Sequence, residues 1–340
     1  MKNTSSILRI ATVFFCVIFL FSYGVYSLLF KANEKAINID YSNTFSPFSF
    51  EKNNSTETAS QQTASNQTET KAVNTATAGS ALGKVVNKSI PSGSDTAAGG
   101  VHLKNSTGVS LDIKKLLSEK LTFTISKNDK PQVLIIHTHA TECFLSEDRD
   151  YYTSADLSRT TDNSKNVTEL GSIIANKLNA ASIKTIHDRT QHDYPSYNSS
   201  YSRAASTIKG YLKKYPSIRV VIDVHRDAIQ SGTTKTKLTA DIKGKRAAQI
   251  MLVMGSETGN IKNFPNWKEN LKLALRLQKN TESMYPTLAR PLSLMSRSYN
   301  ERLTTGSMLI EIGTDANSFD EAKYSAELLS EALIKTLGEK

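Results

Sequence analysis

Short, continuous apolar runs alternate with amphipathic stretches from residue 133 onward, and this alternation limits the folds open to the chain. VLII, VVI, IMLVM and MLI have strand length, and in the stretches between them apolar residues recur every three or four positions. Strands that are apolar throughout are buried on both faces by helices. The sequence therefore predicts a three-layer α/β domain around a mostly parallel central sheet.

Chemically versatile side chains lie where these predicted strands end. His137 and His139 follow VLII, and His225 ends IRVVIDVH. Glu311 lies inside SMLIEIG, in the last predicted strand. Ligands of open α/β sheets bind beyond the carboxyl ends of the strands. We therefore expect these residues, distant in sequence, to meet at one edge of the sheet.

A metal site fits these residue types. His137, His139 and His225 supply imidazole nitrogens, and Glu142 follows the first pair closely. Two imidazoles and a carboxylate are usual ligands of hydrolytic zinc, which keeps its last position open. If the first strand continues far enough, His137 and His139 share one face, although one of them can instead orient a ligand or the substrate. The predicted cofactor is Zn²⁺, with Glu142 as a ligand or catalytic carboxylate.

Glu311 is the most unusual carboxylate in the chain. It stands between Ile310 and Ile312, in a strand that is otherwise apolar. Burial disfavours the charged form of a carboxylate unless a partner compensates it. We interpret Glu311 as a general base that takes a proton from water. The alternative is a buried glutamate paired with Lys or Arg.

Four further residues are predicted to contact substrate. Arg226 follows His225 and can pair with a carboxylate in bidentate geometry, or form a surface ion pair. His187 and His192 enclose the segment HDRTQHD after the second predicted strand, and Asn300 precedes the last one. Each of these also has an ordinary structural role open to it.

Two residues near the predicted ligands add alternatives. Asp223 can hold the imidazole of His225 in one tautomer, or serve as a turn carboxylate. Cys143 stands next to Glu142 and suggests a cysteine hydrolase, but no motif supports that chemistry.

The N-terminal third is organised differently. Residues 10–30 carry no charge and would form a helix of ~31 Å, which is long enough to cross a bilayer. With Lys2 and Arg9 before this anchor, residues 1–9 are expected in the cytoplasm. Residues 31–100 are expected to form a flexible polar linker, and residues 101–340 an extracytoplasmic catalytic domain. The chain is thus predicted to be a single-pass protein of the cell membrane.

The charge balance suggests a polyanionic partner. The formal net charge is +10, which attracts polyanions as well as being common for a basic soluble surface. The sequence shows no helix-turn-helix, zinc-finger or RNA-binding signature, and no phosphate-binding glycine loop. For an exported domain, an anionic cell wall is therefore a better partner than nucleic acid.

Five segments resemble the Stage II sporulation protein P family. They are PQVLIIHTHATE, HDRTQHDYPSYNSSYSRA, VIDVHRDA, NFPNWKENLKLALRL with YPTLARPL, and SYNERLTTGSMLIEIGTDANS, in order over about residues 101–337. The resemblance implies an N-acetylmuramoyl-L-alanine amidase, also credited with endopeptidase activity, that cuts peptidoglycan during engulfment in sporulation. It places the catalytic domain in the septal space between forespore and mother cell. The implied partners are Stage II sporulation protein D, a lytic transglycosylase, and the membrane protein Stage II sporulation protein M.

A more distant similarity to zinc amidases of the cell wall implies a zinc-amidase-like domain. In that pattern His225 fits the ligand after a middle strand, and Glu311 fits the catalytic glutamate near the last strand. The first histidine is His137 or His139, and the carboxylate ligand is Glu142 or Glu169. The glycine-rich GHGG turn of those amidases is missing here. A wall-binding scaffold without catalysis, and a metal-free cysteine or serine hydrolase, are the rival functions.

Overall fold

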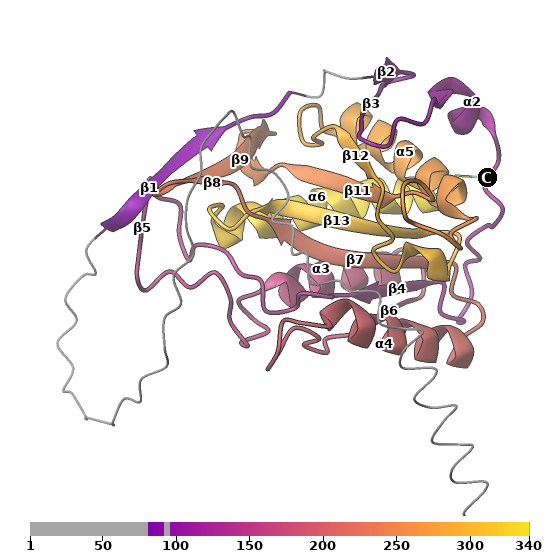
Figure 1. Ribbon diagram of the computed structural model, residues 1–340, viewed down its shortest axis with the longest axis horizontal. Coiled ribbons are helices and arrows are strands. Elements are labelled where there is room, and N and C mark those ends of the chain that lie inside the picture. Colours follow the sequence, from indigo (N-terminus) through magenta and orange to yellow (C-terminus); the bar gives the residue numbers. More distant parts are fainter. Residues whose placement is uncertain (1–80, 92–95, 340) are drawn as a thin grey trace, which may run out of the picture. The chain divides into compact units, whose positions relative to one another are not determined.

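The structure is a computed structural model that describes residues 81–91 and 96–339 (Figure 1). The predicted cytoplasmic segment, the anchor and most of the predicted linker lie outside these ranges. Within them, no helix combines the length and the hydropathy needed to cross a membrane.

The main sheet has eight strands in the spatial order β2-β3-β12-β11-β13-β7-β4-β6. Their bounds are β2 Thr96–Ala98, β3 Val101–Asn105, β4 Val133–Ile136, β6 Thr185–His187, β7 Val220–Asp227, β11 Ile250–Gly255, β12 Leu292–Met295 and β13 Ser307–Thr314. The expected strands between residues 133 and 314 are thus present.

The main sheet is mixed, so the prediction of a mostly parallel sheet is wrong. β11 runs antiparallel to β13, and β2 runs antiparallel to β3, whereas the other neighbouring strands are parallel. Parallel neighbours need a crossover connection. β7 is instead followed by short strands that return the chain to the same end of the sheet, so β11 enters in the opposite direction.

Helices cover both faces of the main sheet, as expected for three layers. Their bounds are α2 Ile113–Ser118, α3 Val167–Ala180, α4 Ser200–Lys214, α5 Trp267–Met284 and α6 Phe319–Gly338, with the short 3-10 helix η1 at Glu301–Leu303. α3, α5 and α6 share the large core on one face, while α4 packs against β4 and β7 on the other. A capping box formed by Ser318 and Glu321 begins α6.

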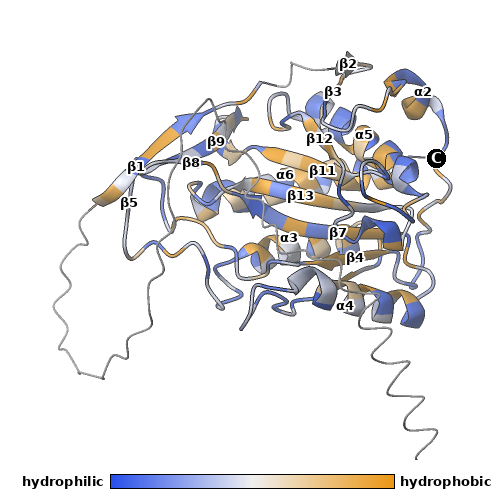
Figure 2. Ribbon diagram, in the orientation of Figure 1, coloured by the Kyte–Doolittle hydropathy of each residue, from blue (hydrophilic) through white to orange (hydrophobic). Residues whose placement is uncertain are grey.

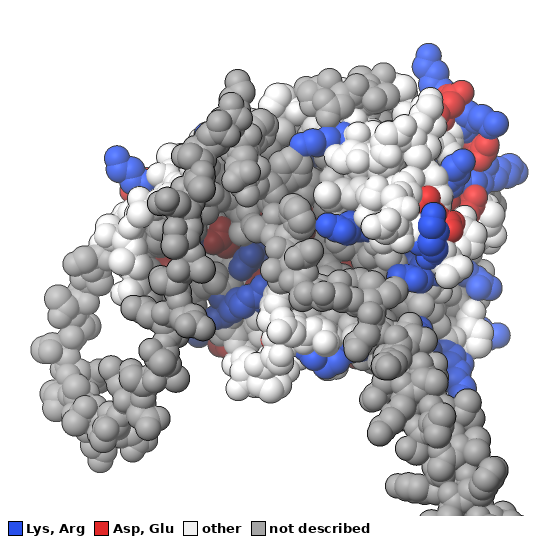
Figure 3. Space-filling model, in the orientation of Figure 1, with Lys and Arg blue, Asp and Glu red and all other residues white. Residues whose placement is uncertain are grey.

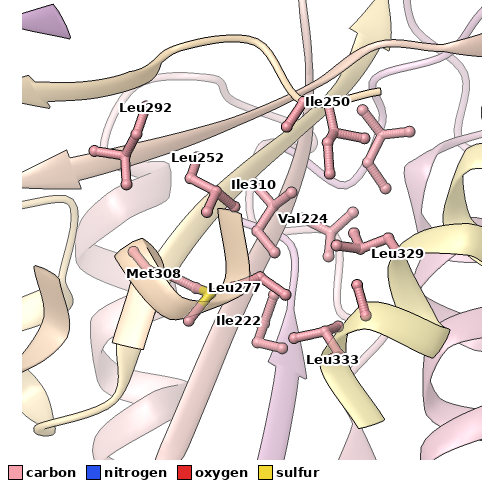
Figure 4. Close-up of a cluster of buried hydrophobic side chains, with 14 of the residues drawn as sticks. Ile222, Val224, Ile250, Leu252, Leu277, Leu292, Met308, Ile310, Leu329 and Leu333 are labelled. Atoms are coloured by element: carbon pink, nitrogen blue, oxygen red, sulfur yellow. The ribbon is translucent and has the colours of Figure 1, made fainter. Parts of the chain in front are cut away.

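The core explains why the strands carry continuous apolar runs. Figure 4 shows Ile222, Val224 and Ile310 packed against Leu329 and Leu333 of α6. In Figure 2 the strands of the main sheet accordingly carry runs of residues in the hydrophobic orange colour. Burying one such side chain contributes about 1.5–3 kcal/mol relative to leaving it exposed.

Successive side chains of β7 and β13 point to opposite faces of the sheet, and this alternation decides on which face each functional residue lies. Ile222 and Val224 of β7 point into the core of α3, α5 and α6, so Asp223 and His225 between and beyond them face the opposite side. In β13 the same alternation turns Glu311 away from that core. β13 and β7 are parallel, and Glu311 pairs in register with His225.

A second, smaller sheet was not foreseen. Its strands follow the order β10-β9-β1-β5, with β8 paired to β9. Their bounds are β1 Ala81–Lys88, β5 Tyr151–Thr153, β8 Gln230–Ser231, β9 Thr234–Ile242 and β10 Lys245–Ala248.

The predicted linker, residues 31–100, therefore overlaps with ordered strands at β1 and β2, and the folded part begins before residue 101. Only Val85 of β1 is buried, and the strand is held by backbone pairing with β9 and β5. A prediction based on apolar burial could not detect such a strand.

Candidate metal centre

Three buried side chains converge beside the carboxyl ends of β4 and β7. His139 and Glu142 lie in the turn that follows β4, and His225 lies in β7. His139 Nδ1 is 3.5 Å from Glu142 Oε1, and His225 Nδ1 is 3.4 Å from Glu142 Oε2. Among the described residues, these three form the candidate ligand group, with one donor atom each and all donors within 4.8 Å of one another.

The donors of the candidate ligand group fit zinc. Two imidazole nitrogens and a carboxylate oxygen are a usual hydrolytic zinc set. His225 Nε2 lies 2.9 Å from Asp223 Oδ1, and this carboxylate is fixed by the backbone NH and the hydroxyl of Thr138. A carboxylate behind a ligating imidazole fixes the ring and its tautomer. Asp223 therefore has the orienting position that the sequence suggested.

The electrostatics of the candidate ligand group favour a cation between its members. Burial lowers the pKa of His225, but the carboxylates of Asp223 and Glu142 outweigh it, so the pKa is raised well above its usual value. Burial raises the pKa of Glu142, yet Arg226, His139 and His225 bring it well below its usual value. Two ionised carboxylates thus enclose His225, and they attract a proton or a metal ion.

Glu311 lies on the strand next to His225. Burial is the main reason that its pKa is raised to about 8; the charges of Asp227 and Glu142 raise it further, and His225 opposes them. Its Oε2 atom has no hydrogen-bond partner. Arg290, the arginine that acts on its charge, is paired with Asp227 at 2.8 Å instead. Glu311 is therefore free to act on a proton, as a general base requires.

His137 does not join the candidate ligand group. β4 ends at Ile136, so the two-residue alternation does not continue to His139, and the condition under which both histidines would share a face is not met. His137 Nδ1 donates to the carbonyl of Val224 at 2.9 Å, and its Nε2 lies 2.8 Å from Nε2 of His187. Because a carbonyl only accepts, Nε2 of a neutral His137 must accept from His187.

The pair of His137 and His187 lies against Gly171 of α3, with His137 fully buried and His187 partly exposed. Burial lowers the pKa of His137 to about 3, with a further contribution from His187. Burial likewise lowers the pKa of His187 to about 4. The pair is therefore neutral at physiological pH, and it supports β7 through Val224, the residue before His225.

Comparison with known proteins shows to which family the chain belongs. The family model described as Stage II sporulation protein P matches residues 23–334. The chain belongs to this family. The Stage II sporulation protein P of Bacillus subtilis (strain 168) is 30% identical over 209 residues, which are 58% of this chain and 49% of that relative. The chain thus spans about half the length of the curated relative that it matches.

Solved structures resemble this member of the Stage II sporulation protein P family more remotely. The N-acetylmuramoyl-L-alanine amidase AmiC2 of Nostoc punctiforme is 10% identical, with a TM-score of 0.36 over 62% of this chain and 96% of that one. The CwlD amidase from Clostridioides difficile, in complex with the GerS lipoprotein, is 10% identical, with a TM-score of 0.38 over 61% and 94%. Similarity this low carries no argument about function.

The remaining predicted residues occupy different positions. Arg226 is buried, and its guanidinium donates to the carbonyls of Cys143 and Ser158 at 3.2 and 2.7 Å, which anchors the segment around Glu142. His192 is buried with its Nε2 3.8 Å from Asp188. These contacts give Arg226 structural partners, whereas His192 Nε2 is buried without a hydrogen-bond partner among the described residues.

Asn300, Glu169 and Cys143 lie outside the candidate ligand group. The side chain of Asn300 donates to the carbonyl of Tyr201 at 2.9 Å. Glu169 lies in the first turn of α3, so of the two candidate carboxylates only Glu142 belongs to the group. Burial raises the pKa of Cys143, whose thiol donates to the carbonyl of Leu157 at 2.9 Å. This opposes a thiolate nucleophile.

Two residues beside Glu142 were missed. Arg159 Nη2 is 3.5 Å from Glu142 Oε1, and the guanidinium lies 4.8 Å from the ring centre of Tyr197. The Tyr197 ring stacks on His139 with centroids 4.6 Å apart. Both lie in irregular segments, where no periodicity points inward. Tyr197 belongs to YPSYNSSYSRA, a segment that carried the family resemblance, which was the one available signal.

Proposed function

We propose that this chain is a zinc-dependent peptidoglycan hydrolase, an N-acetylmuramoyl-L-alanine amidase that acts in sporulation. The observation that carries the proposal is the candidate ligand group, with Glu311 on the neighbouring strand. Membership of the Stage II sporulation protein P family supports the biological setting. A hydrolase of the cell wall also agrees with the net charge of +10.

The zinc ion would be held by His139, Glu142 and His225. When bound, zinc polarises an amide carbonyl and makes a water molecule more acidic. Asp223 keeps the imidazole of His225 oriented toward Glu142. Arg226 fixes the chain segment around Glu142 by donating hydrogen bonds to the carbonyls of Cys143 and Ser158.

Glu311 moves the proton in this proposal. A carboxyl whose pKa lies near neutrality takes a proton from water and returns it to a leaving amine more readily than an ordinary glutamate. Burial and the nearby carboxylates raise the pKa of Glu311 to about 8, and His225 or any other adjacent cation moves it down. The residue is therefore set to exchange a proton near physiological pH.

Endopeptidase activity, anchoring and partners extend the proposal. The same chemistry would hydrolyse a peptide cross-link. Residues 10–30 would tether the domain to the cell membrane, with the catalytic part in the septal space. Stage II sporulation proteins D and M would be its partners, and peptidoglycan its substrate.

One set of variants tests the mechanism. The purified chain is incubated with cell-wall sacculi, with and without a chelator, and its metal content is measured. We expect loss of activity with chelator, restoration by Zn²⁺, and a decrease of about 10²–10⁴-fold in Glu311→Gln without loss of metal. His225→Ala should lose both metal and activity.

The matched control is His102→Gln in β3, whose backbone is held by Gln278 far from the candidate ligand group in the strand order. This variant should keep both its metal content and its activity on sacculi. Full activity in Glu311→Gln would remove the mechanism. Wall binding without any release of peptide would instead establish the scaffold function.

A further inference from the structure

Arg226, which follows the ligand His225, is not available for substrate. Its Nε and Nη2 atoms donate to protein carbonyls, and its side chain is 7% exposed. Any recognition of a substrate carboxylate at this site therefore requires another cation.

Arg159 is a cation at this site that remains accessible. Its side chain is 37% exposed, although Nη1 donates to Asp193 at 2.6 Å and to Thr141 at 3.2 Å. Nη2 approaches Glu142 Oε1 at 3.5 Å without a hydrogen bond. The Nε and Nη2 atoms form one edge of the guanidinium, and no hydrogen bond from this edge to a described residue is present.

Tyr197 holds Arg159 in a fixed orientation beside the candidate ligand group. The tyrosine is 41% exposed, so its ring is accessible from solvent. It contacts the guanidinium of Arg159 and the imidazole of His139, at 4.8 and 4.6 Å between the group centres. Stacking on an aromatic ring fixes the guanidinium plane, and a planar fork binds carboxylates in bidentate geometry.

We propose that Arg159, oriented by Tyr197, is the subsite for a free carboxylate of the stem peptide next to the scissile amide. This inference rests on the proposed function. Arg159 Nη2 is 3.5 Å from Glu142 Oε1. A substrate carboxylate bound to the guanidinium would therefore belong to a residue one or two positions from an amide held at the candidate ligand group. Stem peptides of peptidoglycan carry such carboxylates, whereas glycan hydroxyl groups do not need a charged fork.

The other basic residues on the face drawn in Figure 3 are distributed more widely. In Figure 3, Lys and Arg are spread over the visible face, and their densest group at the upper right, on the side of α2, has Asp and Glu among them. General attraction to the wall can arise from this surface. Selection of one peptide carboxylate requires a fixed donor, which is Arg159.

The test uses two soluble muropeptides that differ only in the second residue, D-glutamate with a free carboxylate or D-isoglutamine with a carboxamide in its place. The zinc-loaded full chain should cleave the carboxylate form with a kcat/KM about 10–100-fold higher. In Arg159→Gln this preference should disappear. Arg159→Lys, which keeps the charge beside Asp193 but lacks the fork, should retain only part of it.

Tyr197→Leu is a second variant, because it disturbs the orientation of Arg159 without removing the partner of buried Asp193. It should raise KM for the carboxylate substrate more than it lowers kcat. Arg246→Gln is the matched control, since Arg246 is 44% exposed and paired with Asp148 in the second sheet. It should keep the full preference.

Binding of the γ-methylamides of the dipeptides L-alanyl-D-glutamate and L-alanyl-D-isoglutamine, in which the γ-carboxyl is blocked as it is in the stem peptide, is measured by calorimetry and separates this inference from the proposed function. If neither muropeptide is cleaved but the acidic dipeptide binds and Arg159→Gln abolishes that binding, the hydrolase proposal fails and the subsite stands. An equal response of wild type to both substrates, or an unchanged preference in Arg159→Gln, would overturn the subsite.

Discussion

Replacing Gly171 with alanine should break the hydrogen bond between His137 and His187, the pair that supports β7 next to His225. Gly171 lies within α3, and a Cβ atom there would be 2.5 Å from His137 Nε2 and 2.6 Å from His187 Nε2. Both distances are shorter than atoms tolerate. His137 cannot move away, because it is fully buried and its Nδ1 is bound to Val224. The hydrogen bond between the two imidazoles would therefore break.

The size of this effect follows from three contributions. Alanine in a helix is about 1 kcal/mol more favourable than glycine. Overpacking a buried site costs about 1–3 kcal/mol, and a buried nitrogen left without a partner costs about 1–3 kcal/mol. The Gly171→Ala chain should thus be about 1–5 kcal/mol less stable than wild type.

Gly210 in α4 provides the matched control. It is also a helix-interior glycine, but an added Cβ would meet no atom within 4 Å. Gly210→Ala should therefore gain up to about 1 kcal/mol. Urea denaturation of the purified chains, followed by circular dichroism, would show midpoints on opposite sides of wild type. Equal stabilisation of both variants would refute the close contact at Gly171.

Other predictions concern the site and its surroundings. Asp223→Asn should weaken zinc binding about 10–100-fold while the fold persists, as measured by competition with a chelator, because the orienting carboxylate of His225 is lost; unchanged affinity would contradict its orienting role. The low pKa values of His137 and His187, about 3 and 4, mean that unfolding takes up protons below pH 6.5, so stability should fall as pH decreases from 6.5 toward 4. Each histidine contributes a slope of about 1.4 kcal/mol per pH unit, and His187→Gln should remove one such contribution from denaturation measured at several pH values. Cys143→Ala should keep catalytic activity toward sacculi, since the buried thiol has a raised pKa; inactivation with normal folding would instead favour the cysteine hydrolase.

The sequence predicted the parts of the fold that depend on apolar periodicity. β4, β7, β11 and β13 contain the continuous apolar runs, and α3 to α6 carry the expected stripes. β9 escaped prediction because its sequence, TKTKLTADI, has the composition of an exposed strand. Lys235 and Lys237 are nevertheless buried, and they are paired with Asp315 and Glu321. Burial of paired charges leaves no trace in a hydrophobic pattern.

The site was predicted by residue type more successfully than by geometry. His225 and Glu311 come together because β7 and β13 are neighbours, and Glu142 joins them from the turn after β4, the strand on the other side of β7. The choice between His137 and His139 depended on where β4 ends, and strand ends are not encoded by alternation. The sequence could not show whether Arg226 or Arg159 is accessible to a substrate carboxylate. That depends on which carbonyls and carboxylates surround each guanidinium after folding.

The position of β13 in the sheet has a consequence for when the site is formed. β13 lies between β7 and β11, although it follows both in the chain and ends near the C-terminus. During synthesis, β7 and β11 are complete while the slot between them is still empty. A growing chain therefore already holds His139, Glu142 and His225 but lacks Glu311, so β13, the last of the described strands in chain order, would complete the candidate site.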